Sequence, residues 1–150
     1  MKLNYQPRRR SFILLALVWA SIISNFSNDN FSAAKTAPYI ERWLGAIAPS
    51  ANINTIHTLH ILIRKSAHFI EYGIFALLLF GIWAAGALPW PKRPIIYVIG
   101  IVASFALLDE YHQSFVRSRL PSIWDSLIDT LGGISALALL WLAQRKKFQT

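Results

Sequence analysis

Long apolar runs separated by short polar segments dominate this chain. A transmembrane helix needs roughly 20 consecutive apolar residues, and several stretches come close to that length. The spans that we predict cover residues 11–28, 66–88, 94–110 and 124–143. The pattern therefore predicts an all-α, polytopic integral membrane protein with about four transmembrane helices, built as a single membrane domain over residues 1–150.

The segment between the first two spans, residues 29–64, is mixed in character. Apolar side chains recur in it at helical spacing, in one stretch after Pro38 and another after Pro49. The two stretches contain Ile40, Trp43, Leu44 and Ile47, and then Ile56, Leu59 and Ile63. We expect short amphipathic helices in this outer loop, and two arrangements stay open: helices lying on the membrane surface, or a lid packed on the other helices.

The composition narrows the class of protein. The chain is 55% hydrophobic and only 15% charged, which is too apolar for an ordinary soluble globule. The excess of 15 Lys and Arg over 7 Asp and Glu lies beside the apolar runs, and this placement favours lipid head groups over nucleic acid. Cysteine is absent, which excludes disulfides, thiolate metal sites and cysteine nucleophiles.

The first apolar run follows three arginines, Arg8, Arg9 and Arg10. Basic residues before an apolar run also occur in cleavable signal peptides. No small-x-small cleavage site ends this run, so we interpret it as a membrane helix.

The basic residues set the expected orientation. One side of the membrane would hold nine of them and no acidic residue: Lys2, Arg8, Arg9, Arg10, Lys92, Arg93, Arg145, Lys146 and Lys147. The other side would hold the remaining basic residues and all 7 Asp and Glu. Because cytoplasmic loops carry the excess of Lys and Arg, we expect a multi-pass protein of the cell membrane with both termini cytoplasmic and the polar site toward the outer face.

Several charged side chains are expected at one depth in the membrane. The third span has about fifteen residues before Asp109, or roughly 22 Å of helix, which is less than the ~30 Å thickness of the hydrocarbon core. Asp109 and Glu110 should therefore lie below the outer surface. Similar counts along the second and fourth spans bring more groups to this level: His68, Glu71, Asp125 and Asp129.

Helical spacing groups the side chains of the second and third spans. Lys65, His68 and Tyr72 share one face at positions i, i+3 and i+7. Asp109 and Gln113 share another at i and i+4.

The fourth span shows the same kind of spacing. Asp125 and Asp129 share a face, and Gly132 and Ala136 continue it, which lets a neighbouring helix approach closely. Ser122 and Asp125 have the serine-x-x-acid spacing of a helix N-cap. Carboxylates at membrane depth cost on the order of 2.5–3.5 kcal/mol each, so their clustering indicates a functional site. A set of ion pairs that fixes the helix register is the alternative.

The residues of this cluster form a recognisable pattern. It comprises Arg64 to Tyr72 (RKSAHFIEY) and Asp109 to Phe115 (DEYHQSF), followed by Arg119, Asp125 and Gly132. The pattern resembles that of the VanZ-like family of membrane proteins over roughly residues 11–143. The family pattern carries over at Lys65, His68, Tyr72, Asp109, Glu110, Gln113, Arg119 and Asp125. The chain departs from it at Asp129, where the family usually has Asn, and this adds a negative charge or a shared proton.

The resemblance implies a role in the chemistry of cell-envelope lipids. The family's named member is associated with resistance to the glycopeptide teicoplanin, whose target is a lipid-linked cell-wall precursor. The family is also similar, remotely, to enzymes that exchange or hydrolyse lipid head groups. The expected partner is therefore a membrane lipid or a lipid-linked cell-wall precursor.

We hypothesise an enzyme, a lipid head-group transferase or hydrolase. It would act at the outer membrane surface on the phosphate-linked head group of a phospholipid or polyprenyl lipid. Arg117 and Arg119, with Lys65, would bind the phosphate oxygens through charge-assisted hydrogen bonds. Tyr72 and Gln113 are further candidates for binding the substrate.

His68 would be the general acid or base, because its ordinary pKa lies near the operating pH. Glu71 or Asp109 would orient it. The remaining carboxylates would hold polar atoms of the substrate or a Mg²⁺ or Mn²⁺ ion, which prefer oxygen ligands. The candidate ligands are Asp109, Glu110, Asp125 and Asp129.

Non-catalytic functions stay open beside this hypothesis. The same residues would serve a lipid or antibiotic binder, or a small proton-coupled transporter. A structural partner of a larger membrane complex is a third alternative.

Other polar and aromatic residues are expected outside the site. We expect His57 and His60 to be solvated on an amphipathic surface helix and His112 to be peripheral. The tryptophans are interpreted as anchors at the membrane interface, including Trp19, Trp43, Trp90, Trp124 and Trp141.

Overall fold

The computed structural model describes residues 5–84, 92–119 and 121–147, and these residues are helical with short connections and no strand. The helices are α1 (Tyr5–Phe26), η1 (Asp29–Phe31), α2 (Ala33–Ile47), α3 (Ile53–Ala84), α4 (Lys92–Gln113) and α5 (Ile123–Lys147). Four contain segments long and apolar enough to cross a membrane: Arg8–Phe26, Ile53–Ala84, Pro94–Gln113 and Ile123–Arg145. The predicted all-α membrane fold with four spans is therefore confirmed.

Some of the predictions fall outside this description. Lys2, the end of the second span beyond Ala84 and the turn with Trp90 lie outside the described residues. The side chains of four basic residues that support the predicted orientation are also outside it: Lys92, Arg93, Lys146 and Lys147.

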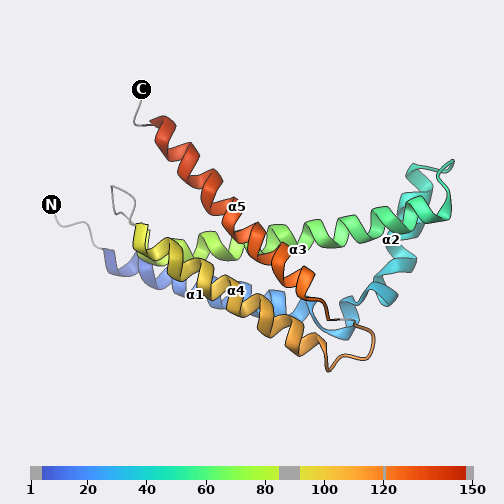
Figure 1. Cartoon of the computed structure of the whole chain (residues 1–150), viewed down its shortest axis with the longest axis horizontal. Coiled ribbons are helices and arrows are strands. Elements are labelled where there is room, and N and C mark those ends of the chain that lie inside the picture. Colours follow the sequence, from blue (N-terminus) through green and yellow to red (C-terminus); the bar gives the residue numbers. More distant parts are fainter. Residues whose placement is uncertain (1–4, 85–91, 120, 148–150) are drawn as a thin grey trace.

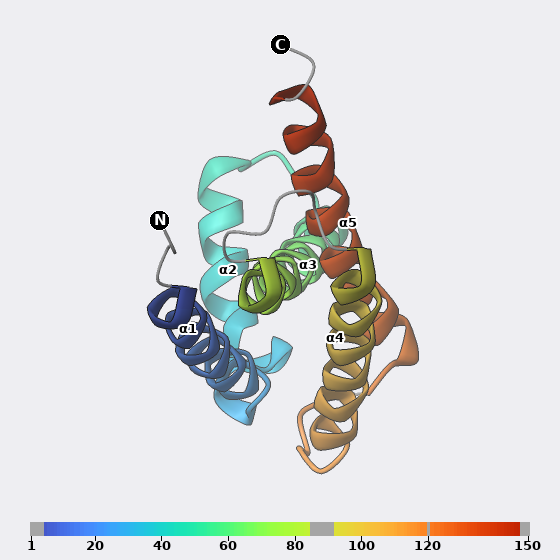
Figure 2. The ribbon, with the colours of Figure 1, turned by 90° about the vertical axis from the view of Figure 1, so that its left-hand side faces the viewer.

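Helix α3 occupies the centre of the fold. It packs against α1, α2, α4 and α5, and Figure 2 shows it nearly end-on with the other helices around it. Its buried side chains include Tyr72, Phe75 and Phe80, which join Val98 and Val102 of α4 in one apolar core. Because lipid tails are as apolar as these side chains, close packing rather than exclusion of water holds such helices together in a membrane.

Helix α3 begins at Ile53, well before the predicted start of the second span at residue 66. The side chain of Asn52 caps it, since its Oδ1 accepts hydrogen bonds from the backbone N–H and the hydroxyl of Thr55 (2.8 and 3.0 Å). Arg64 and Lys65 add charge without breaking the helix. The second amphipathic stretch of the outer loop is consequently the first part of α3. At 32 residues α3 is ~48 Å long, more than the ~30 Å of a hydrocarbon core.

Helix α2 is the amphipathic helix of the outer loop. It begins at Ala33, five residues before Pro38. Its Leu44 is buried, as is Ile56 of α3 where the two helices pack together. The sequence left two arrangements open, a helix on the membrane surface or a lid packed on other helices. In the structure α2 packs on α3 and η1, as a lid does.

The opposite face of α2 is apolar and exposed. Tyr39, Trp43 and Ile47 follow one another at intervals of four residues and are 79%, 60% and 62% exposed. This face has the composition of a surface that meets lipid at the membrane interface.

Helix α5 crosses α3 obliquely (Figure 1), and small residues let the two backbones meet. A Cβ atom added to Gly132 would lie 2.1 Å from the carbonyl oxygen of Phe69. One added to Gly73 would lie 3.4 Å from the carbonyl oxygen of Gly132. The close approach predicted at Gly132 is confirmed.

We predict that Gly132→Ala destabilises the protein, because the added methyl group must push α5 away from the backbone of α3. Overpacking of this kind costs about 1–3 kcal/mol. Gly100→Ala is the matched control, because a Cβ at this position on α4 meets no atom within 4 Å. Thermal unfolding in detergent should show a lower midpoint for Gly132→Ala and an equal or higher midpoint for Gly100→Ala. Equal midpoints for the two variants would contradict the close crossing.

Candidate functional site

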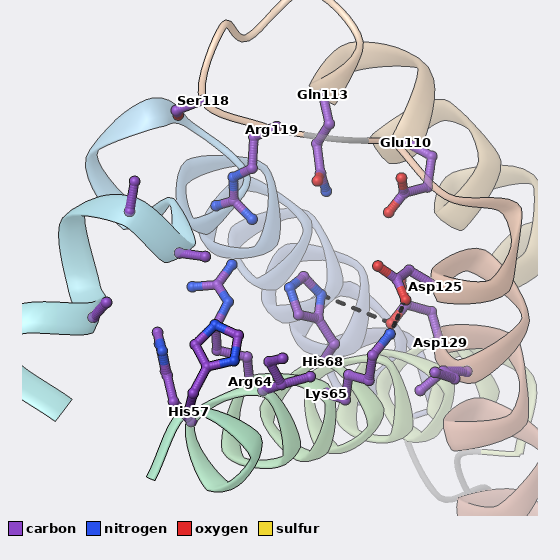
Figure 3. A pocket seen from close by; sticks show the side chains of 16 residues that line it. His57, Arg64, Lys65, His68, Glu110, Gln113, Ser118, Arg119, Asp125 and Asp129 are labelled. Atoms are coloured by element: carbon purple, nitrogen blue, oxygen red, sulfur yellow. Dashed lines mark hydrogen bonds and ion pairs between the residues drawn. The ribbon is translucent and has the colours of Figure 1, made fainter. Parts of the chain in front are cut away.

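A cavity of about 380 Å³ lies beside α3, where α4 ends and α5 begins (Figure 3). Residues of α2, α3 and α5, together with the end of α4 and the loop that follows it, line this cavity. Its charged and polar lining residues are His57, His60, Arg64, Lys65, His68, Glu110, Gln113, Ser118, Arg119, Asp125 and Asp129. Its size suits a small polar group rather than a whole lipid.

The cavity brings together most of the predicted site residues. Those that line it are Lys65, His68, Glu110, Gln113, Arg119, Asp125 and Asp129. Those outside its lining are Glu71, Tyr72, Asp109 and Arg117.

Two pairs of side chains join α3 to α5 across the cavity. Nδ1 of His68 lies 3.7 Å from Oδ1 of Asp129, and the ammonium group of Lys65 donates a hydrogen bond to Asp125. Asp129 is 1% exposed, and its Oδ1 has no hydrogen-bond partner among the described residues. The pairs follow from the helical spacing on each side, since His68 lies one turn from Lys65 and Asp129 one turn from Asp125.

Tyr72 and Glu71 lie elsewhere on α3. Tyr72 is fully buried in the apolar core, with its ring 6.2 Å from that of Phe105. The backbone carbonyl of Glu71 accepts a hydrogen bond from the indole of Trp19 (2.9 Å), which ties α1 to α3. The acid beside His68 is thus Asp129 and not Glu71.

Asp109 lies outside the cavity lining and holds a residue that lines it. It is 5% exposed, and its Oδ2 accepts hydrogen bonds from the hydroxyl of Ser27 (2.6 Å) and from Nε2 of Gln113 (2.9 Å). These bonds fix the end of α1 to the end of α4 and hold the amide of Gln113 in place. Asp109 and Gln113 were predicted to share one face of the helix, and their hydrogen bond agrees with this prediction.

Glu110 caps the start of α5. Its Oε2 accepts a hydrogen bond from the backbone N–H of Ser122 (2.7 Å), just before the helix begins at Ile123. In a capping box the acid three residues after the cap would accept this bond. Here that acid, Asp125, pairs with Lys65 instead, so the predicted helix start is right but the carboxylate that serves it comes from α4.

The guanidinium group of Arg119 caps the end of α1. It donates hydrogen bonds to the carbonyl oxygens of Phe26 and Asn28, where the last carbonyls of a helix lack partners and carry partial negative charge. Arg119 is 9% exposed, and its Nε has no hydrogen-bond partner among the described residues. Burial lowers the pKa of Arg119 while the carboxylates of Asp109 and Glu110 oppose this shift, and a guanidinium keeps its charge at neutral pH in any case.

Arg64 of α3 is the second guanidinium group in the cavity. It donates hydrogen bonds to the carbonyl oxygen of Phe31 (2.9 Å) and to the hydroxyl of Thr36 (3.2 Å). Neither Arg64 nor Arg119 has a carboxylate within ion-pair distance in the described part of the chain. Two cations with only neutral partners therefore face the same cavity.

The loop after α4 is tied to the segment after α1. Asp29 accepts hydrogen bonds from the ammonium group of Lys35 and from the hydroxyl of Ser118. Ser118 lines the cavity, whereas Arg117 beside it is exposed and does not. The guanidinium group that accompanies Arg119 in the cavity is therefore that of Arg64 and not that of Arg117.

Two expectations about the histidines were wrong. His57 is exposed as predicted, but both His57 and His60 line the cavity instead of lying outside the site, and His60 is 2% exposed. Its Nδ1 lies 3.6 Å from Oε1 of Glu41 on α2, because α2 covers this side of α3. These errors arose because the sequence does not show which face of α3 the lid covers. His112 is exposed and outside the cavity, as expected.

The carboxylates proposed as metal ligands do not form a set. Within residues 5–84, 92–119 and 121–147, no group of three or more His, Asp or Glu side chains is arranged to hold a metal ion. Asp109 faces Ser27 and Gln113, while Glu110 faces the start of α5. The arrangement gives the predicted Mg²⁺ or Mn²⁺ site no support.

Sequence reasoning missed Ser27, Arg64 and Ser118 as parts of the site. Arg64 stands beside Lys65 in the motif, and its place on the same turn was a usable signal. Ser27 and Ser118 come from loops whose positions depend on tertiary contacts. No pattern in the sequence marks them.

We predict that the contribution of Asp29 to stability depends on pH. The hydrogen bonds from Lys35 and Ser118 hold the pKa of Asp29 below its usual range. The stabilisation is present above the ordinary pKa of an aspartate, about 4, and is lost as the pH falls through the lower folded-state value. Asp29→Asn should lower the unfolding midpoint in detergent at pH 7, and the difference from wild type should shrink below about pH 4. A difference that is the same at both pH values would contradict the assignment.

The chain was compared with known proteins. The family model described as VanZ/LLP1 matches residues 12–144. No curated protein and no solved structure matches.

Proposed function

Because the chain belongs to the VanZ/LLP1 family, we propose that its cavity binds the phosphate-linked head group of a membrane lipid and catalyses the transfer or hydrolysis of that group. The four helices able to span a membrane place the chain in a lipid environment. Phospholipids and lipid-linked cell-wall precursors both carry such head groups. The family match by itself does not select a substrate.

The pair of guanidinium groups is the observation that carries the proposal. Arg64 and Arg119 line one cavity, and each bonds only to neutral groups of the described residues. A guanidinium matches the geometry of phosphate oxygens and binds them through charge-assisted hydrogen bonds. An anion between the two groups would relieve their mutual repulsion. A phosphate is the anion that a membrane lipid supplies at this position.

His68 is the residue that we propose as the general acid and base. In Figure 3 it stands between Arg64 and Arg119 on one side and Asp125 and Asp129 on the other. It would take a proton from an attacking water or alcohol as the new P–O bond forms. It would then return this proton to the alcohol oxygen that leaves as the old P–O bond breaks. Asp129 would keep the ring oriented and stabilise its protonated form.

The other acids serve as positioning residues in this proposal. Asp109 holds Gln113 within α4 and joins the end of α4 to the end of α1 through Ser27. Glu110 fixes the end of α4 to the start of α5. Asp125 performs the same task toward α3 through Lys65.

We also propose that the cavity opens toward the outer face. Arg8, Arg9 and Arg10 lie at the start of α1 and Arg145 near the end of α5, and Figure 1 shows both ends remote from the start of α5. Clusters of basic residues favour the cytoplasmic side. The end of the molecule that carries the cavity and α2 would then face outward.

We predict that a cysteine at position 50 is accessible from outside the cell. Ser50 is exposed between α2 and α3, and the chain has no natural cysteine. A membrane-impermeant maleimide should label Ser50→Cys in intact cells. A cysteine added after Thr150 should be labelled only after the cells are opened. The reverse pattern would refute the proposed orientation.

We predict that His68→Asn lowers the rate of head-group release or transfer by about 10²-fold or more, the usual contribution of a general acid or base. Purified protein in lipid nanodiscs would be given phospholipids and polyprenyl phosphates, with Mg²⁺, Mn²⁺ or EDTA, and products followed by mass spectrometry. His112→Asn is the matched control, because His112 is exposed on α4 and outside the cavity.

The outcomes of this experiment separate the function classes. Turnover by wild type and His112→Asn but not by His68→Asn supports the enzyme. If wild type leaves every lipid unchanged under all three conditions, the catalytic proposal is wrong. Binding without turnover would then identify a lipid binder.

A further inference from the structure

We propose that the head group bound here carries a primary ammonium beside its phosphate, as phosphoethanolamine does, and that Glu110, Gln113 and Asp125 bind this ammonium. The inference rests on the proposed function, because it requires the phosphate to lie against Arg64 and Arg119. It adds the chemical class of the substrate.

The cavity is polarised. Figure 3 shows Arg64 and Arg119 toward α2 and the end of α1, with Glu110 and Asp125 toward the junction of α4 and α5. His68 stands between the two groups. The ammonium of Lys65 also lies at the acidic wall, paired with Asp125, and Asp129 adds a further carboxylate there. Basic and acidic walls facing each other across one small cavity complement a ligand with a negative and a positive end.

The acidic wall offers three acceptor oxygens. Oε2 of Glu110 accepts from Ser122, and Oδ1 of Asp125 accepts from Lys65. Gln113 donates a hydrogen bond from its Nε2 to Asp109, so the side-chain carbonyl oxygen of Gln113 remains as an acceptor. The second oxygen of each side chain has no hydrogen-bond partner among the described residues, and all three side chains line the cavity.

Three acceptors match a primary ammonium, which has three N–H donors. Glu110 and Gln113 are only 8% and 5% exposed, so a ligand that fills the cavity removes them from water. A head group without a donor would leave these oxygens unpaired, and burying an unpaired polar group is costly. A quaternary ammonium carries the charge but no N–H, and a glycerol head group carries no positive charge.

The test measures binding of three phospholipids with identical short acyl chains to the full-length protein in detergent. The probes are the ethanolamine, choline and glycerol phospholipids, and binding is followed by isothermal titration calorimetry. We expect the ethanolamine lipid to bind about tenfold tighter than the other two, the effect of one charged hydrogen bond or more.

Glu110→Gln is the first variant, because its amide oxygen can still accept the N–H of Ser122 and cap α5. In this variant the Kd of the ethanolamine lipid should come to within about threefold of the Kd of the choline lipid. Asp125→Asn is the second variant, to be used if Glu110→Gln does not fold. It should also reduce the preference for the ethanolamine lipid. Glu41→Gln is the matched control, because Glu41 does not line the cavity, and it should keep the preference.

Two results would overturn the inference. If the three lipids bind equally and Arg64→Gln weakens all of them, the ammonium site is wrong and the phosphate site stands. If none of the lipids binds wild type, both proposals fail.

Discussion

The contact between the backbones of α3 and α5 at Gly132 controls the geometry of the site. Phe69, whose carbonyl oxygen meets Gly132, is the neighbour of His68 in the chain, and Asp129 lies one helical turn before Gly132. The approach of the two backbones therefore brings His68 to Asp129 and, one turn further, Lys65 to Asp125. A side chain at position 132 would separate both pairs at once, because a helix moves as a unit and cannot adjust one turn alone.

The polar residues around this crossing divide into two layers with different tasks. The outer layer, Ser27 with Asp109 and Glu110 with Ser122, joins the ends of α1, α4 and α5. The inner layer, Arg64, His68 and Arg119, faces the cavity, and Glu110 belongs to both layers because it also lines the cavity. Charged groups deep in a membrane protein are costly unless other groups satisfy them. Asp109 is satisfied by the side chains of Ser27 and Gln113, and Glu110 by a backbone N–H at the start of α5. Arg119 bonds to backbone carbonyls after α1, so neither outer carboxylate pairs with an arginine.

The sequence predicted the spans well because apolar length and helical spacing are local properties. The grouping of Lys65 with His68 on one helix face and of Asp125 with Asp129 on another also followed from spacing, as did the role of Gly132. The partner of each of these side chains did not follow from spacing. Three outcomes depend on how each helix is rotated and on where α2 lies. Asp129 rather than Glu71 lies beside His68, Arg64 rather than Arg117 accompanies Arg119, and His60 is buried. Sequence spacing identifies a face of a helix but not the element that covers it.

The length of α3 has a consequence for how the cavity responds to its surroundings. From Ile53 to Tyr72 the helix contains neither Gly nor Pro, so the part that carries α2 and the part that carries His68 form one stiff rod. The exposed Tyr39 and Trp43 on α2 are residues of the kind that anchor a helix at the membrane interface. A thicker or thinner bilayer changes the tilt of such a helix. Because α3 meets α5 at Phe69 and Gly132, beside His68, a change in tilt would move the part of α3 that carries α2 more than it moves His68. The thickness of the bilayer would thus act on the cavity through the position of α2, which lines one of its sides.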